Sequence, residues 1–290
     1  MSYRVDRVLS LATSKHLNKK SLNFKETLDH GMHGLGFSPY GQGQAPGDVI
    51  TEEQVRARMK IIAPYTLWVR SFSCTEGNEW IPIVAKEMGL KTLVGAWISD
   101  DHEKNEEEIQ ALIDLANRGF VDIAAVGNEV LYREELEEEE LLQLMRRVKQ
   151  SLPHVPIGYV DAYYEFENRP ALVDHSDVIL SNCYPFWEGC AFEYSILYMK
   201  DMYRRASQAA QGKKVIITET GWPSRGQAFH GAVPSQENAK HYFIECQKWS
   251  HEEAIEMFYF TSFDEDWKVG AEGDVGAYWG IWDKNEQFKF

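Results

Sequence analysis

The sequence predicts a single-domain (β/α)8 barrel, and three observations lead to this fold class. Short apolar runs suited to buried strands recur eight times along the chain, and segments with helical spacing lie between most of them. Alternating strands and helices indicate a parallel sheet, and eight strands in about 250 residues match the count and length of a barrel. No linker rich in Pro, Gly or Ser divides the chain. A doubly wound open sheet is the alternative fold for the same pattern.

The predicted elements follow one another in a regular order. The strands are the apolar runs Leu35–Tyr40, Leu67–Phe72, Thr92–Trp97, Ile123–Val126, Pro156–Val160, Val178–Cys183, Val215–Thr218 and Met257–Phe263. The helices repeat apolar residues every three or four positions, and they are Glu52–Ile62, Trp80–Met88, Glu106–Ala116, Leu136–Leu152, Tyr194–Ala209 and Gln236–Trp249. Residues 1–30 are polar and weakly patterned, so we expect an N-terminal extension there and the barrel in residues 31–290.

The acidic balance of the chain restricts its partners. The formal net charge of −15 disfavours nucleic acid and anionic membrane surfaces, because both attract basic patches. A neutral ligand is indifferent to this charge. Aromatic residues make up 13% of the sequence, and flat rings form half-exposed binding surfaces as well as core. We therefore expect a neutral ligand, no nucleic acid and a monomeric chain.

The sequence carries no recognisable targeting or metal-binding pattern. No apolar run approaches the roughly 20 residues that span a bilayer. Residues 1–30 lack the apolar core of a secretory signal, so we expect a cytoplasmic protein, or a secreted or periplasmic one whose signal was removed. Neither CxxC nor HExxH spacing occurs, so we expect free thiols, no metal and no cofactor. The acidic run Glu134–Glu140 predicts the first turn of the following helix, because helix N-termini favour negative charge. A calcium site is the alternative interpretation of the same run.

Two glutamates end predicted strands on opposite sides of the expected barrel. Glu129 follows the fourth strand and Glu219 follows the seventh. Catalytic side chains of a barrel lie at the carboxyl ends of its strands, so these two would face each other across the mouth. Glycosidic bond cleavage needs such a pair, one protonated and one ionised, and proximity separates their pKa values. Two unrelated strand-end carboxylates, capping a helix or pairing with an Arg, are the alternative interpretation.

The residues around these glutamates resemble a known family. Val126-Gly-Asn-Glu129 and Ile217-Thr-Glu-Thr-Gly-Trp-Pro-Ser224 closely resemble the two active-site signatures of glycoside hydrolase family 17, the β-1,3-glucanases and glucanosyltransferases. The similarity runs in family order from about Gly34 to the C-terminus, and further matching segments are Gly36–Tyr40, Val69–Phe72, Asn182–Pro185 and Phe263–Lys268. The resemblance implies a bacterial or fungal-like enzyme that hydrolyses laminarin-type β-1,3-glucan with retention. Transfer of the glucan to another sugar is the alternative reaction, and a non-catalytic β-glucan-binding barrel is a third interpretation.

The resemblance also implies roles for individual residues. Glu129 would be the acid/base and Glu219 the nucleophile, with their carboxyl groups roughly 5–5.5 Å apart as retention requires. Asn128 would donate to the sugar 2-hydroxyl, and Tyr184 would donate its phenol proton to Glu219.

Further residues are expected at the rim of the cleft. Glu265 and Lys268 are similar to an accessory pair of the family. Sugars present apolar C–H faces, so aromatic rings at strand ends are candidate platforms, among which Tyr40, Trp97 and Trp222 are expected to bind substrate. Trp222 is favoured most because it lies three residues after the expected nucleophile.

Overall fold

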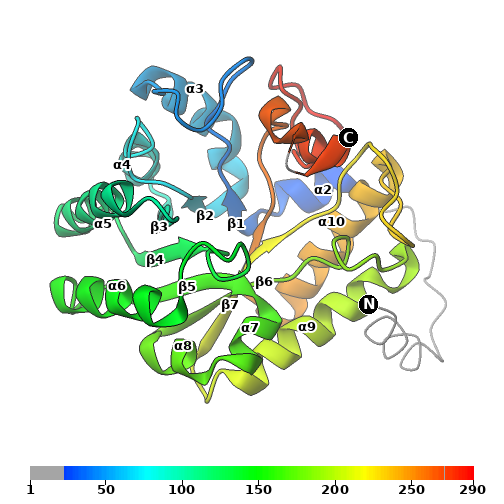
Figure 1. Ribbon diagram of the computed structural model, residues 1–290. Helices are drawn as coiled ribbons and strands as arrows, with labels where there is room; N and C mark the ends of the chain where they lie inside the picture. The colour runs from blue at the N-terminus through cyan, green and yellow to red at the C-terminus, as the bar shows by residue number, and fades with distance from the viewer. Residues whose placement is uncertain (1–22, 271) are drawn as a thin grey trace.

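Eight parallel strands close into a barrel in the computed structural model, which describes residues 23–270 and 272–290 (Figure 1). The strands are β1 (Met32–Gly36), β2 (Thr66–Ser71), β3 (Lys91–Ala96), β4 (Ile123–Asn128), β5 (Ile157–Ala162), β6 (Val178–Asn182), β7 (Lys214–Thr220) and β8 (Met257–Tyr259). Each strand pairs with the next, and β8 closes the ring by pairing Tyr259 with Leu35 of β1. The predicted (β/α)8 fold is therefore confirmed, and the open sheet is excluded.

Strand side chains fill the inside of the barrel. A cluster separate from the main core joins buried residues of six strands, and its members are Leu93, Ile123, Ala125, Val160, Val178, Leu180, Ile216 and Phe258. Gly34 makes room for this packing, because a Cβ atom at that position would lie 2.4 Å from the ring of Phe258. The barrel is thus a packed core, and a binding site is expected only at its mouth.

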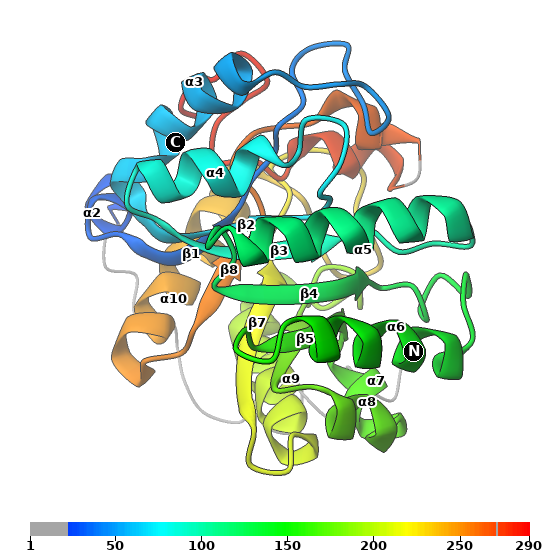
Figure 2. The same cartoon turned by 90° about the vertical axis from the view of Figure 1, so that its left-hand side faces the viewer.

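Helices cover the outside of the barrel, and Figure 2 shows α4, α5 and α6 lying along its flank. The helices are α2 (Phe24–Asp29), α3 (Glu52–Ile62), α4 (Trp80–Glu87), α5 (His102–Asn117), α6 (Glu138–Ser151), α7 (Tyr163–Asn168), α8 (Pro170–His175), α9 (Ser195–Ala209) and α10 (Gln236–Glu253). Short 3-10 turns are η1 (Ala63–Tyr65), η2 (Phe192–Tyr194), η3 (Asp266–Val269) and η4 (Gly273–Tyr278). Thr51, Asp101 and Ser235 begin α3, α5 and α10, since each side chain accepts a hydrogen bond from the backbone N–H three residues on.

Several features of these helices bear on the predictions. The acidic run places Glu138–Glu140 in the first turn of α6, as predicted. The short helices α7 and α8, the second of which begins at Pro170, were not predicted, because six residues each give too few turns for a periodic pattern. No helix in the described part of the chain combines the length and hydrophobicity that a membrane span requires.

The last predicted strand ends earlier than expected. Met257–Phe263 reads as one apolar run, but β8 stops at Tyr259. The extended backbone continues, with Ser262 N–H still donating to Gly36 O of β1 at 3.0 Å. It also pairs with a later segment, since Thr261 N–H donates to Trp279 O at 3.2 Å and Trp282 N–H donates to Ser262 O at 2.9 Å. The sequence pattern shows an extended apolar segment but not which neighbour takes its hydrogen bonds.

The predicted N-terminal extension lies mainly outside the described residues, since only 23–30 of it are described. Those residues include α2, which lies beside α10 (Figure 1). The ring of Phe24 stacks on Phe243 of α10 with centroids 4.4 Å apart and on Phe290 at 4.6 Å. This end of the predicted extension is therefore packed on the barrel, and the boundary at residue 30 stays a prediction.

Candidate active site

A cavity of about 690 Å³ opens beside the carboxyl ends of β4 to β7. Carboxylates and aromatic rings line it, and the lining residues are Glu129, Tyr132, Ala162, Tyr163, Tyr164, Asn182, Tyr184, Trp187, Glu188, Glu219, Phe260 and Glu272. Both glutamates predicted from the strand ends are among them. The closed ring thus brings together two residues that are 90 positions apart in the sequence.

An unusual backbone turn presents Glu129 to this cavity. Gly127 has φ +86° and Glu129 itself has φ +54°, a left-handed conformation that non-glycine residues rarely adopt. The Glu129 N–H donates to Val160 O of β5 at 2.8 Å, which holds this turn. Left-handed backbone at a non-glycine residue costs of order 1–3 kcal/mol and is concentrated at functional sites.

The carboxyl group of Glu129 has a strongly shifted pKa. Burial raises this pKa to about 7, and the negative charge of Glu219 adds to the rise. A hydrogen bond donated by Asn182 Nδ2 to Glu129 Oε1 at 2.7 Å and the positive charge of Arg70 both lower this pKa. Thr218 donates to the other end of the same amide at 2.9 Å, which fixes its orientation. Glu129 is therefore a carboxyl group that can hold a proton near neutral pH.

Glu219 has a different set of partners. Arg70 Nη1 donates to Oε1 at 2.6 Å, and the Tyr184 hydroxyl donates to Oε2 at 2.8 Å. Arg70 is buried on β2, so its guanidinium reaches across the barrel to form this ion pair. The two oxygens are each held by one strong donor, which fixes the rotation of the carboxylate as well as its position.

Arg70 also connects the two glutamates. Its Nη2 donates to Asn128 Oδ1 at 2.7 Å, so the neighbour of Glu129 is oriented by the same guanidinium that binds Glu219. Because the oxygen of the Asn128 amide faces Arg70, the amide presents its Nδ2 donor on the other side. One buried cation therefore sets the relative placement of both strand ends.

The family is decided by comparison with known proteins. The BtgE/BtgC glycoside hydrolase domain matches residues 34–280. The chain belongs to this glycoside hydrolase family. The predicted family, and with it the predicted enzyme class, is confirmed.

Several relatives of this glycoside hydrolase span nearly its whole length. A glucan 1,3-beta-glucosidase of Arthroderma benhamiae is 31% identical over 277 residues, which cover 88% of this chain and 89% of the relative. A glucan 1,3-beta-glucosidase of Schizosaccharomyces pombe is 27% identical and covers 86% of this chain and 84% of its own. The structure of a Rhizomucor miehei beta-1,3-glucanosyltransferase mutant in complex with laminaritriose is similar with a TM-score of 0.80 and 26% identity, covering 90% of this chain and 96% of that one.

The predicted accessory pair of the glycoside hydrolase lies against a residue of the cavity wall. Lys268 Nζ lies 3.0 Å from Glu265 Oε2, and the same ammonium lies 4.1 Å above the ring of Phe260, which lines the cavity. Tyr40 is largely buried near this pair, and its ring meets Trp267 edge-on with centroids 6.0 Å apart. The direct contact of Glu265, Lys268 and Tyr40 with substrate stays a prediction.

The expectation for Trp222 is wrong. Its side chain is only 1% exposed, and its Nε1–H donates to Val233 O at 3.0 Å. The indole packs among Phe186, Phe192 and Tyr242. An aromatic ring whose N–H has a partner is most stable out of water, so the turn after Glu219 directs this ring into the core. Trp222 therefore has no surface on which a sugar ring could stack.

Sequence reasoning quoted some site residues without giving them a role. Arg70 and Asn182 both lie in segments that match the family. Arg70 could have been identified from its place inside an apolar strand, because a buried cation needs a partner of opposite charge. Glu188 and Glu272 carried no signal, because each lies in a loop just beyond a matched segment, yet both line the cavity. Trp97 is 37% exposed but is absent from the lining residues.

Proposed function

We propose that this glycoside hydrolase cleaves β-1,3-linked glucan with retention of configuration, using Glu129 as acid/base and Glu219 as nucleophile. The observation that carries the proposal is the contrast between two carboxyl groups in one cavity: the pKa of Glu129 rises to about 7, while Glu219 is ion-paired with Arg70. A proton donor beside an ion-paired carboxylate is the pair that a two-step displacement requires. The substrate follows from the relatives, which are named for 1,3-linked glucan.

In the first step, Glu129 transfers its proton to the glycosidic oxygen as the bond to C1 breaks. Glu219 forms a bond to C1 from the opposite side and gives a covalent glycosyl-enzyme. In the second step, Glu129 takes a proton from water, the water oxygen attacks C1, and Glu219 leaves. Arg70 and Tyr184 hold the attacking carboxylate throughout, since each donates to one of its oxygens. Asn128 supplies the donor for the 2-hydroxyl.

The stereochemistry of the first product tests this mechanism. When the enzyme is incubated with laminari-oligosaccharides and followed by ¹H NMR, the new reducing end is expected to appear first as the β-anomer and to convert slowly to the α-anomer. Retention follows from two inversions at C1. Early appearance of the α-anomer would contradict a covalent intermediate on Glu219, and absence of any cleavage would contradict the assignment to 1,3-linked glucan.

The same incubation tests the second candidate function, glucan transfer. This candidate is favoured by the similarity to a beta-1,3-glucanosyltransferase structure with 96% of that chain covered. In transfer, a sugar hydroxyl in place of water attacks C1 of the glycosyl-enzyme. Products longer than the donor, seen early by chromatography, would identify transfer, whereas only shorter products would identify hydrolysis.

The pH dependence of kcat/KM should change when a second buried carboxyl group is removed. Asp161 of β5 is buried, and its negative charge contributes to the raised pKa of Glu129. Burial raises the pKa of Asp161 itself to about 6, so it is largely ionised where Glu129 titrates at about 7. Asp161→Asn removes that charge and keeps an acceptor for Tyr159. The pKa of Glu129 should therefore fall.

The measurement is kcat/KM against pH, whose alkaline limb reports the proton on Glu129 in the free enzyme. This limb is expected to move to lower pH in Asp161→Asn. The matched control is Asp174→Asn, an exposed aspartate on α8, which should leave the profile in place. An unchanged or upward-shifted limb in Asp161→Asn would show that Asp161 does not act on the acid.

A further inference from the structure

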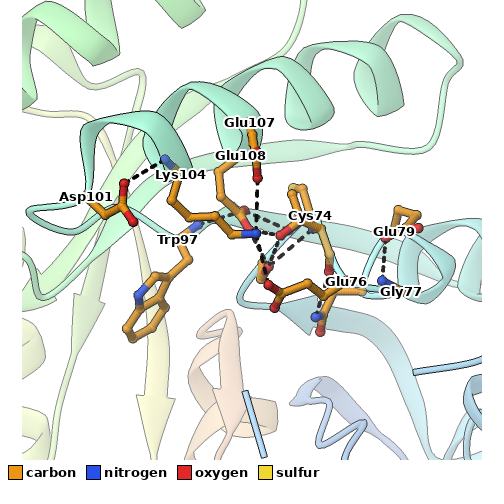
Figure 3. Close-up of polar contacts among 12 residues, drawn as sticks. Cys74, Glu76, Gly77, Glu79, Trp97, Asp101, Lys104, Glu107 and Glu108 are labelled. Atoms are coloured by element: carbon orange, nitrogen blue, oxygen red, sulfur yellow. Dashed lines mark hydrogen bonds and ion pairs between the residues drawn. The ribbon is translucent and has the colours of Figure 1, made fainter. Parts of the chain in front are cut away.

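A buried carboxylate outside the cavity connects two loops of the barrel mouth. Glu108 lies on α5 and is only 1% exposed. The hydroxyls of Ser73 and Thr75 and the backbone N–H of Cys74 donate to it at 2.5–2.8 Å, and the backbone N–H of Trp97 donates at 3.0 Å. Its two oxygens thus hold the loop after β2 and the first residue after β3 at one point (Figure 3).

Other contacts around Glu108 keep this junction closed. The Cys74 thiol donates to Gly95 O of β3 at 3.3 Å. One turn earlier on α5, Lys104 Nζ pairs with Glu76 at 3.0 Å and with Glu107 at 3.3 Å. Breaking a buried, multiply bonded carboxylate is costly, so the backbone at Trp97 has little freedom to move.

The side chain of Trp97 points away from this junction (Figure 3). The indole is 37% exposed, and the guanidinium of Arg133 lies 4.5 Å from its ring centre. Arg133 also donates to the backbone oxygens of Asn128 and of Ile98. One guanidinium therefore joins the exposed ring to the residue that precedes Glu129. Since Trp97 follows β3, it lies on the β3 side of Glu129, and it is not among the residues that line the cavity.

We propose that Trp97 is a stacking platform for a glucose unit outside the cavity and that Glu108 is the positioning residue that holds it there. The inference rests on the proposed function, because it assigns a binding role on the same cleft. A flat ring with a fixed backbone and a guanidinium against it offers an apolar face to the C–H face of a sugar at little cost in side-chain entropy. The extra contact is made only by chains long enough to reach it.

The test compares kcat/KM on laminarihexaose with that on an aryl β-laminaribioside. Trp97→Ala is expected to lower kcat/KM about tenfold on the hexaose and less than twofold on the short substrate, mainly through KM, because remote contacts are lost only for long chains. Glu108→Gln should show the same dependence on chain length, since a misplaced platform binds poorly. The matched control Glu103→Gln changes an exposed carboxylate on the same helix that takes no part in the junction, and it should behave as wild type.

The double variant separates positioning from general destabilisation. If Glu108 acts through Trp97, Trp97→Ala/Glu108→Gln should lose no more on the hexaose than Trp97→Ala alone. Additive losses, equal losses on both substrates, or an unchanged Trp97→Ala would overturn the inference. Where Glu108→Gln does not fold, Thr75→Ala, which removes one donor, takes its place. Wild-type inactivity on both substrates would instead count against the proposed function itself.

Discussion

Glu219→Ala is expected to lower kcat on laminarin by roughly 10⁴-fold or more, since it removes the carboxylate that forms the covalent intermediate. Arg70 and Tyr184, the two residues that contact this carboxylate, are both hydrogen-bond donors and cannot take over as the nucleophile. Initial rates of reducing-sugar release measure the effect. A near-wild-type rate would remove Glu219 from the mechanism.

Loss of fold must be separated from loss of chemistry in this experiment. Truncation leaves the buried guanidinium of Arg70 without its ion-pair partner, and breaking a buried pair costs about 3–5 kcal/mol. Glu219→Gln is the control, because its amide oxygen can still accept from Arg70 while the nitrogen cannot attack C1. A thermal melt close to that of wild type, together with the same loss of activity, is the expected result for Glu219→Gln.

Glu129→Ala is expected to lower kcat/KM on laminarin by about 10²–10⁴-fold, the range for loss of a general acid and base. An aryl glucoside with a good leaving group needs no proton in the first step, so the glycosyl-enzyme should still form and accumulate. Azide should then restore turnover, because it attacks C1 without base assistance. The pKa of about 7 for Glu129 is consistent with a group that serves as acid and then as base.

The product identifies which glutamate was removed. Rescue of Glu129→Ala should give the β-glycosyl azide, because azide replaces water at the second inversion. Azide attack in Glu219→Ala would occur at the unreacted substrate and would give the α-azide. Failure of azide to rescue Glu129→Ala on the aryl substrate would show that Glu129 does not serve as the acid/base.

The sequence identified those site residues that can be recognised from a single strand and its end. Glu129 and Glu219 each follow an apolar run, and a barrel places all such ends at one mouth, so their meeting could be predicted once eight strands were counted. Arg70 could not be placed in the same way. Its partners Glu219 and Asn128 belong to two other strands, and only closure of the ring brings them within 2.6–2.7 Å.

Aromatic residues show the limit of sequence reasoning most clearly. Trp97 ends a predicted strand and Trp222 lies in the loop after another, and the sequence favours Trp222 as the substrate platform because it is three residues from Glu219. In the structure one is 37% exposed and the other 1%. The difference arises because α10 and the loops near Phe186 cover Trp222, whereas Trp97 has Arg133 against its ring and stays partly in water.

By itself, the sequence determined the order of strands and helices, the barrel class and the two glutamates, because hydrophobic periodicity and strand-end carboxylates are properties of neighbouring residues. The tertiary structure alone decided which rings face water, which donor holds each carboxylate, and why the pKa of Glu129 lies at about 7. These properties depend on burial and on charges contributed by strands that are distant in the sequence. The strands come close to one another only when the barrel closes.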